Sequence, residues 1–218
     1  MKEDIPQIAI MSYGHENATE GYTLESLGED FELTVPPENV LMAVCAHHQA
    51  KELIDQGIDA SILTVGGAAE SNMNIVLKIN ELTETNVPVR ADRGSNSVAS
   101  NIQTLKSYEN PFIIVCQKFA ELRTYIHSKY HLGKENFKTL SWESYIEGTK
   151  FSTFESNLLE ELKGMSSVPL QRKVVEGVLT ALAIIDPKNG GTKFVASVRQ
   201  HLREKNPEEN VFRKTGLH

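Results

Sequence analysis

The chain lacks the long apolar segments that mark membrane and secreted proteins. Within its 218 residues, no run approaches the ~18 consecutive apolar residues that a transmembrane helix needs. Its first residues, Met1 to Pro6, contain three charged side chains and a proline and lack the apolar block of a secretory signal. We therefore expect a cytoplasmic protein that does not act at a membrane.

Cysteine and basic residues are also scarce. The two cysteines, Cys45 and Cys116, are too few for a disulfide framework or a zinc site made of thiolates. The 22 basic residues are outnumbered by 29 acidic ones, which gives a formal net charge of −7. Such a chain has no broad basic face, so we expect no binding to nucleic acid. A small anionic molecule can still bind locally, because one helix N-terminus and one arginine suffice. The oligomeric state stays open.

Three common motifs of nucleotide and ester chemistry are missing. The chain has no Gly-x-Gly-x-x-Gly after its first apolar run, no Gly-x-x-x-x-Gly-Lys-Ser/Thr, and no Gly-x-Ser-x-Gly. These absences disfavour dinucleotide oxidoreductases, P-loop enzymes and ordinary α/β-hydrolases.

Short apolar runs alternate with helical patterns over the first two thirds of the chain. The runs predict strands at 7–12, 61–65, 87–91, 112–116 and 137–140, and the patterns between them predict helices at 36–57, 70–83, 97–108 and 119–132. A polar connection without a clear period follows the first strand up to Val35. Strands separated by single helices pair in parallel through right-handed crossovers. We predict an α/β fold, a three-layer αβα domain with a mostly parallel, Rossmann-like sheet, over residues 1–142.

The pattern changes after Trp142. Apolar stripes at 154–162, 174–185 and 194–202 predict three more helices. We expect residues 143–218 to form a helical C-terminal subdomain packed on the α/β domain.

Polar residues follow the predicted strands, at the edge where an open parallel sheet binds ligands. Glycines there let backbone N–H groups approach a ligand, hydroxyl and amide side chains supply neutral hydrogen bonds, and an arginine can hold a phosphate or carboxylate at two points. The candidates, in strand order, are Ser12, Gly14, His15 and Glu16; Gly66, Gly67 and Glu70; Asp92, Ser95, Ser97 and Asn101; and Gln117 and Arg123.

Structural interpretations compete with these functional ones. Gly66–Gly67 is also typical of a tight turn into a helix, and a serine in 95–97 is typical of an N-cap. Arg123 lies on a predicted helix, where a surface acid can pair with it.

Three further groups of reactive side chains are weighed in the same way. His47 and His48 are adjacent in a predicted helix, so they point in different directions and cannot share a metal there. His15 and Glu16 lie in the first loop and are acid/base candidates. Cys116 has no base placed to activate it.

Three short segments, each after a predicted strand, resemble the motifs of one family. They read TVGGAAE at 64–70, SNSVASN at 95–101 and CQKFAELR at 116–123. The stretch from Ile62 to Gly133 is similar to the YdcF-like domain, which is shared with the SanA and ElyC envelope proteins. That family shows Ser-Gly-Gly followed by an acid, then Ser-x-Asn-Thr-x-Glu-Asn, then Thr-x-x-x-His-x-x-Arg.

The chain departs from the family pattern at its reactive positions. Ser100 stands where the family has a glutamate, and Ala120 stands where it has a histidine. Histidine is the usual acid or base near neutral pH, and alanine cannot transfer a proton. If the family's chemistry needs these groups, this protein binds its ligand without turnover.

The resemblance implies an α/β domain with a polar pocket at the strand ends. It implies a nucleotide-like, adenosyl or phosphorylated ligand, S-adenosylmethionine among them. We expect the chain to resemble the soluble members and not the membrane-anchored envelope members. The residues that would hold the ligand are Gly14, Gly66, Gly67, Ser95, Ser97, Asn101, Gln117 and Arg123. Glu70 is the one carboxylate kept from the family set.

Three functional hypotheses follow. The first is a ligand-binding or transfer protein of the YdcF-like type, with Glu70 as its carboxylate. The second is a hydrolase or transferase that uses His15 or Glu16 as acid or base. The third is a non-catalytic interaction protein whose C-terminal helices form the working surface.

Overall fold

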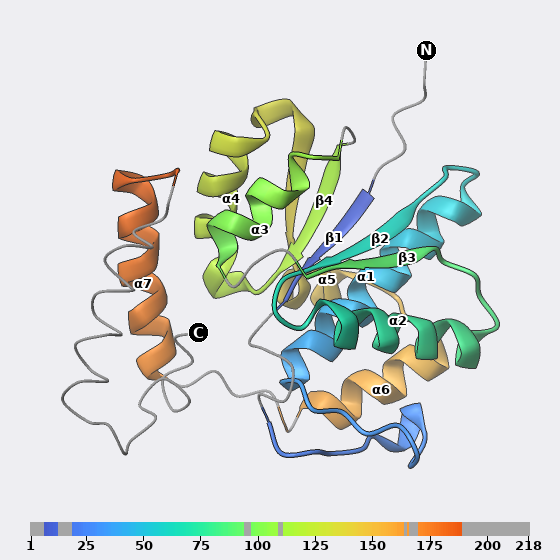
Figure 1. Ribbon diagram of the computed structural model, residues 1–218. Coiled ribbons are helices and arrows are strands. Elements are labelled where there is room, and N and C mark those ends of the chain that lie inside the picture. Colours follow the sequence, from blue (N-terminus) through green and yellow to red (C-terminus); the bar gives the residue numbers. More distant parts are fainter. Residues whose placement is uncertain are drawn as a thin grey trace.

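A single parallel sheet organises the protein. The computed structural model describes residues 7–12, 19–93, 97–108, 111–163, 165 and 170–188, with only the backbone described at 170–174. Its five strands lie in the order β3-β2-β1-β4-β5, and every neighbouring pair is parallel (Figure 1). The strands are β1 (Gln7–Met11), β2 (Ser61–Val65), β3 (Val89–Asp92), β4 (Phe112–Cys116) and β5 (Phe137–Ser141).

Helices cover both faces of this sheet. Helices α1 (Pro37–Asp55) and α2 (Ala69–Thr83) pack together on one face, and α3 (Val98–Leu105) and α4 (Lys118–His131) pack together on the other (Figure 1). The chain adds β2 and β3 on one side of β1, and then returns to add β4 and β5 on the other side. The predicted three-layer, Rossmann-like α/β fold is therefore confirmed.

The central strands are buried on both faces, as their continuous apolar sequences predict. In β1, Ile8 and Ile10 belong to the core beneath α1 and α2, whereas Ala9 and Met11 belong to the core beneath α3. Successive side chains of a strand point to opposite faces, so a strand covered on both sides is apolar at most positions.

The connection before α1 is packed, although its sequence shows no period. Leu24, Leu27, Leu33 and Val35 are buried in the core beneath α1 and α2. A short 3-10 helix, η1 (Glu25–Leu27), and a bridge between Tyr22 and Leu33 shape this segment. The packed segment brings isolated apolar residues to the core through turns, which leaves no helical or strand repeat to detect.

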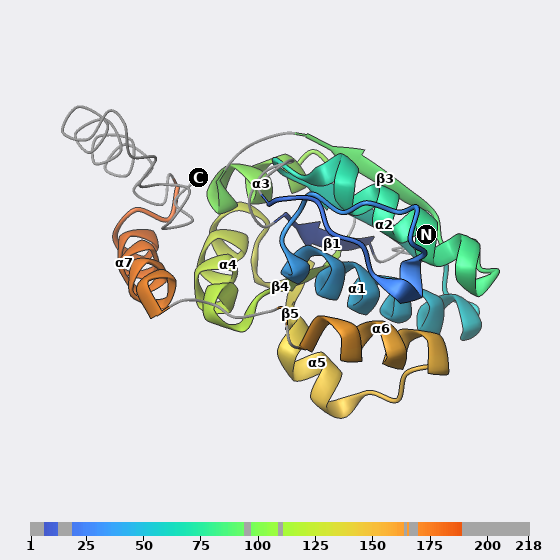
Figure 2. The same ribbon diagram turned by 90° about the horizontal axis from the view of Figure 1, so that it is seen from below.

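The helices after β5 lie in two different places. Helices α5 (Trp142–Gly148) and α6 (Thr153–Lys163) pack against α1, and α7 (Leu170–Ile185) packs against α4 on the opposite face (Figure 2). Leu158, Leu159 and Leu162 of α6 belong to the same core as Ile8. The domain boundary at 142/143 stays a prediction.

Two of the three helices expected after Trp142 correspond to α6 and α7, and the one expected at 194–202 lies outside the described residues. Helix α5 was not expected from the sequence, and it starts directly at the end of β5. Ser141, the last residue of β5, caps this helix by accepting a hydrogen bond from the Ser144 N–H at 3.3 Å. None of the described helices combines the length and apolarity needed to cross a bilayer.

The packing of α6 into the core can be tested with Leu158→Ala. Leu158 is fully buried, so we expect the free energy of unfolding to fall by about 2–5 kcal/mol in chemical denaturation. Leu122→Ala is the control, because Leu122 is 57% exposed on α4 and should change stability by no more than about 0.5 kcal/mol. Equal effects of the two substitutions would contradict the packing of α6 described above.

Candidate functional site

The carboxyl ends of β1 and β2 meet α3 at a glycine. Gly66, the first residue after β2, has a φ of +110°, and a Cβ placed on it would lie 2.7 Å from Asn101 Nδ2 and 3.2 Å from the Ser12 Cβ. Both the backbone angle and the close approach require glycine at this position. The structure therefore brings Ser12, Gly66 and Asn101 together, as the sequence analysis expected of residues at this edge.

Backbone hydrogen bonds hold the three strand ends in line. The Ser12 N–H donates to the Val65 carbonyl at 2.9 Å, and the Gly66 N–H donates to the Asp92 carbonyl at 3.1 Å. Asp92 also accepts a hydrogen bond from the Tyr108 hydroxyl at 2.7 Å. These bonds extend the sheet one residue beyond β1 and β2 and fix the edge on which the polar side chains stand.

Two further amides lie at this edge. Asn72, on α2, is fully buried and donates from Nδ2 to the Ser12 Oγ at 3.1 Å. Gln117 is 3% exposed and directly follows β4. The pairing of β1 with β4 ends at Ile10 and Val115, so Ser12 and Gln117 each lie two residues beyond it, at the same end of the sheet. We call Asn72, Asn101 and Gln117 the edge amides.

The edge amides carry buried polar atoms without hydrogen-bond partners. These atoms are the Oδ1 atoms of Asn72 and Asn101 and both Oε1 and Nε2 of Gln117. Gln117 occupies the N-cap position of α4, but its side chain makes no capping bond. An unpaired buried polar group costs about 1–3 kcal/mol, and folded proteins usually satisfy such groups with water or a ligand. The cluster is therefore suited to receive a polar molecule.

Arg123 pairs with an internal carboxylate. Its Nε donates to Glu176 Oε1 at 2.5 Å and its Nη2 donates to Glu176 Oε2 at 2.9 Å, which joins α4 to α7. Both side chains are largely buried. The role of Arg123 as a ligand for an anion stays a prediction, and in this structure it would require Glu176 to leave.

Glu70 also has a partner. It stands in the first turn of α2, is partly exposed, and forms an ion pair with Arg93. The hydrogen bond from Arg93 holds the pKa of Glu70 below its ordinary value. A carboxyl group with a lowered pKa is ionised near neutral pH, so in this arrangement Glu70 can accept a proton but is poorly suited to donate one.

Ser97 is the N-cap of α3. Its Oγ accepts a hydrogen bond from the Ser100 N–H at 3.2 Å and lies 2.7 Å from the Ser100 Oγ. The predicted N-cap role of a serine in 95–97 is thus confirmed for Ser97. Ser100, which stands where the family has a glutamate, takes part in the same cap.

Glu143 of α5, which binds the start of α4, was not among the residues expected from the sequence. Glu143 Oε2 accepts a hydrogen bond from the Lys118 N–H at 2.9 Å, and burial raises the pKa of Glu143. The signal was available, because Glu143 lies two residues beyond β5 and therefore at the same edge as the other candidates.

The remaining sequence candidates divide into two groups. Gly67 is partly exposed in the turn between β2 and α2. Gly14, His15, Glu16 and Ser95 lie outside the described residues. Cys116 is buried, and burial raises the pKa of its thiol, so it stays protonated and unreactive.

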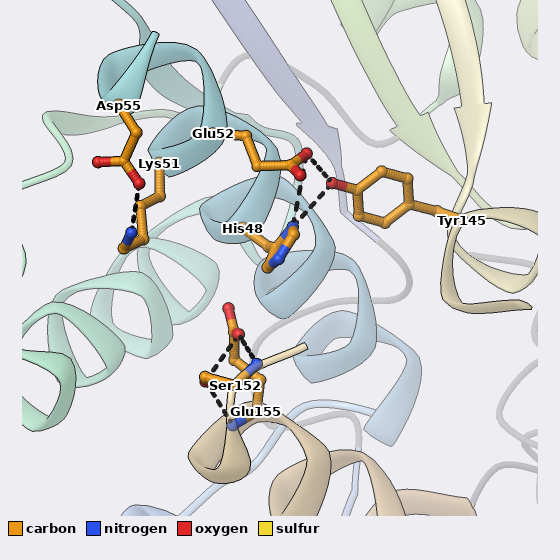
Figure 3. A network of polar contacts seen from close by, with 7 residues as sticks. All are labelled: His48, Lys51, Glu52, Asp55, Tyr145, Ser152 and Glu155. Atoms are coloured by element: carbon orange, nitrogen blue, oxygen red, sulfur yellow. Dashed lines mark hydrogen bonds and ion pairs between the residues drawn. The ribbon is translucent and has the colours of Figure 1, made fainter. Parts of the chain in front are cut away.

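The adjacent histidines of α1 have separate structural partners. His47 Nε2 lies 3.1 Å from Asn80 Oδ1 and 2.9 Å from Thr85 Oγ1. His48 Nδ1 lies 2.9 Å from the Tyr145 hydroxyl, which itself donates to Glu52 Oε2 at 3.0 Å (Figure 3). The second network joins α5 to α1.

Metal binding finds no support in these groups. Among the described residues, no group of three or more His, Cys, Asp or Glu side chains is placed to hold a metal ion. The two histidines serve the packing of α1 against its neighbours.

Comparison with known proteins adds no relative. A scan against family models finds no match, and neither do searches of curated proteins and of solved structures. The resemblance to YdcF-like domains therefore stays a prediction that rests on the three motifs.

The close approach at Gly66 can be tested with Gly66→Ala. We expect a loss of at least about 1 kcal/mol of stability, because the new Cβ meets Asn101 and Ser12 and because alanine is strained at this φ. Gly57→Ala is the matched control, since Gly57 also has a positive φ but nothing lies within 4 Å of the added Cβ. If thermal unfolding shows the same loss for both variants, Asn101 does not crowd Gly66.

Burial of His47 predicts a pH dependence of stability. Burial lowers the pKa of His47 below its ordinary value of 6.5, so the folded state binds fewer protons than the unfolded state. The stabilisation is complete above pH 6.5 and is lost as the pH falls below it. We expect His47→Gln to reduce the loss of unfolding free energy between pH 7.5 and 5.5, measured by urea denaturation. An unchanged slope would show that His47 does not titrate in this way.

Proposed function

We propose that this protein binds a small nucleotide-like molecule at the carboxyl edge of its sheet, between the ends of β1, β2 and β4. The observation that carries the proposal is the cluster of edge amides, whose buried polar atoms have no partners in the described structure. Four such atoms in three side chains at this end of the sheet are costly unless a bound molecule or water pairs with them.

The position of the cluster supports binding. The strand order reverses at β1, which has β2 on one side and β4 on the other. Ligands of open α/β sheets bind at such switch points, because the connections from the two neighbouring strands lead to helices on opposite faces of the sheet. Ser12 follows β1 and Gln117 follows β4, so the two residues flank the switch point.

The chemistry of the edge amides suits an adenosyl group. Each carboxamide offers one acceptor oxygen and an NH₂ donor, which match ribose hydroxyls and the ring nitrogens and amino group of a nucleobase. S-adenosylmethionine, which the family resemblance suggests, would supply a transferable methyl group when bound. The acid or base candidates for a reaction, His15 and Glu16, lie outside the described residues. The proposal therefore covers binding.

A thermal-shift panel of nucleosides, nucleotides, S-adenosylmethionine and sugar phosphates tests the proposal. A ligand present at 100 times its Kd stabilises the folded state by about 2.7 kcal/mol, which is readily measured. We expect at least one nucleoside-containing compound to stabilise the protein and Gln117→Met to abolish the shift. Gln103→Met is the matched control, because Gln103 is exposed on α3.

The stability of the free variant provides an independent measurement. Because the Gln117 amide is unpaired, Gln117→Met should leave the unfolding free energy unchanged or raise it by up to about 2 kcal/mol. A panel without any shift, or a ligand shift that survives in Gln117→Met, would contradict the proposed site. A clear destabilisation of Gln117→Met would show that the amide already has partners.

A further inference from the structure

The protein's own carboxylates bind the arginines and the backbone N–H that could otherwise attract an anion. Glu176 binds Arg123 at two points, which is the geometry that an arginine offers to a phosphate. Glu143 accepts the hydrogen bond of the Lys118 N–H at the start of α4, where a phosphate would otherwise bind. Glu70, in the first turn of α2, forms an ion pair with Arg93.

The pairing of Arg123 belongs to a larger docking surface on α4. His127 Nδ1 lies 2.8 Å from the Pro187 carbonyl and His131 Nε2 lies 3.3 Å from the Lys188 carbonyl, so Arg123, His127 and His131 contact α7 and its C-terminal extension from three successive turns. Freeing Arg123 for a ligand would therefore disturb the contact of a whole helix.

The contact of α7 with α4 combines polar and apolar groups. Glu176 is the one acidic residue of α7 and its side chain is only 6% exposed, whereas Val178, Ile184 and Ile185 of the same helix are exposed. Ala183 of the same helix is fully buried and Leu179 and Leu182 are partly buried, so apolar burial contributes to the contact beside the ion pair. The ion pair with Arg123 is thus a determinant of how α7 sits on α4.

Negative charge gathers beyond β4. The charges of Glu121, Glu143 and Glu176 all act on the Cys116 thiol and reinforce the effect of burial in raising its pKa. Glu143 accepts the hydrogen bond of the Lys118 N–H, so this carboxylate lies next to Gln117. Glu176 is bound to Arg123, six residues beyond Gln117 on α4. These carboxylates would repel a phosphate that entered this region, whereas they would not repel an uncharged group.

We infer that the group this edge recognises is uncharged, such as the hydroxyls of a sugar or the polar edge of a nucleobase, and that Glu176 and Glu143 exclude phosphate from it. The inference rests on the proposed function. It concerns which part of the ligand the edge amides hold, and it does not require any element to move.

Matched neutral and phosphorylated compounds test the inference. Adenosine and adenosine 5′-monophosphate are the first pair, together with the corresponding forms of any other nucleoside that stabilises the protein. Binding is measured by isothermal titration calorimetry in 20 and 200 mM NaCl. We expect the nucleoside to bind at least as tightly as its phosphate, with less than a twofold effect of salt. A tenfold preference for the phosphate that weakens steeply with salt would overturn the inference.

Charge-neutral variants test the exclusion itself. In Glu176→Gln and Glu143→Gln, we expect the affinity for adenosine 5′-monophosphate to rise at least tenfold while the affinity for adenosine stays within twofold. Glu160→Gln is the matched control, since it makes the same charge change on an exposed residue of α6. If neither variant strengthens phosphate binding, these carboxylates do not exclude it and the inference is wrong. Circular dichroism of each variant checks that it is folded, and the salt comparison on the unmodified protein does not depend on any variant.

The two proposals fail in different ways. If no compound binds, the proposed function is wrong. If the phosphorylated compounds bind more tightly and Gln117→Met abolishes their binding, the proposed function stands and the inference about the uncharged group is wrong.

Discussion

The contact between Gly66 and Asn101 is the constraint on which the edge of the sheet depends. Because Gly66 has no side chain and adopts a positive φ, the Asn101 amide can lie against the end of β2 and close to Ser12. Ser12 in turn receives the hydrogen bond of Asn72 from α2. One glycine thus allows residues from both helical layers to meet at the ends of the strands. A side chain at position 66 would meet the Asn101 amide, which would then have to move away from the end of β2.

The helices after β5 shape the charge of this edge as well as the packing. Glu143 of α5 and Glu176 of α7 each bind a group at α4, although α5 and α7 lie on opposite sides of the sheet. Buried carboxylates need partners, and α4 supplies an arginine and a backbone N–H. The described helices after β5 therefore supply two of the carboxylates that α4 binds.

Much of the fold could be predicted from local patterns. Apolar runs buried on both faces gave strands at 61–65 and 112–116 with the bounds of β2 and β4. The alternation of strands and helices then gave parallel pairing. Helix α5 escaped because it is a seven-residue helix that starts at the end of β5. The segment before α1 escaped because its buried leucines are spaced by turns.

The site could be predicted only where position in the fold determines it. Ser12, Gly66, Asn101 and Gln117 were candidates because each follows a strand, and the structure places them along one edge. Asn72 was missed because an asparagine within a helix carries no sign in the sequence that it is buried. The partner of Arg123 was also beyond prediction, since Glu176 is 53 residues away and any acid of the C-terminal helices would have fitted the pattern equally well.

Clustering distinguishes the edge amides from other unpaired polar groups. In the described part of the chain, Gln7 at the opposite end of β1 and Ser128 within α4 each leave one buried atom without a partner. Such single atoms are ordinary in folded proteins and one water can satisfy them. Gln117 leaves both amide atoms unpaired, and two further amides stand around the same strand ends. One water cannot satisfy several donors and acceptors with fixed positions. A polar ligand with several hydrogen-bonding groups could pair with them at once, and this is why we propose a ligand for the edge amides and not for Gln7 or Ser128.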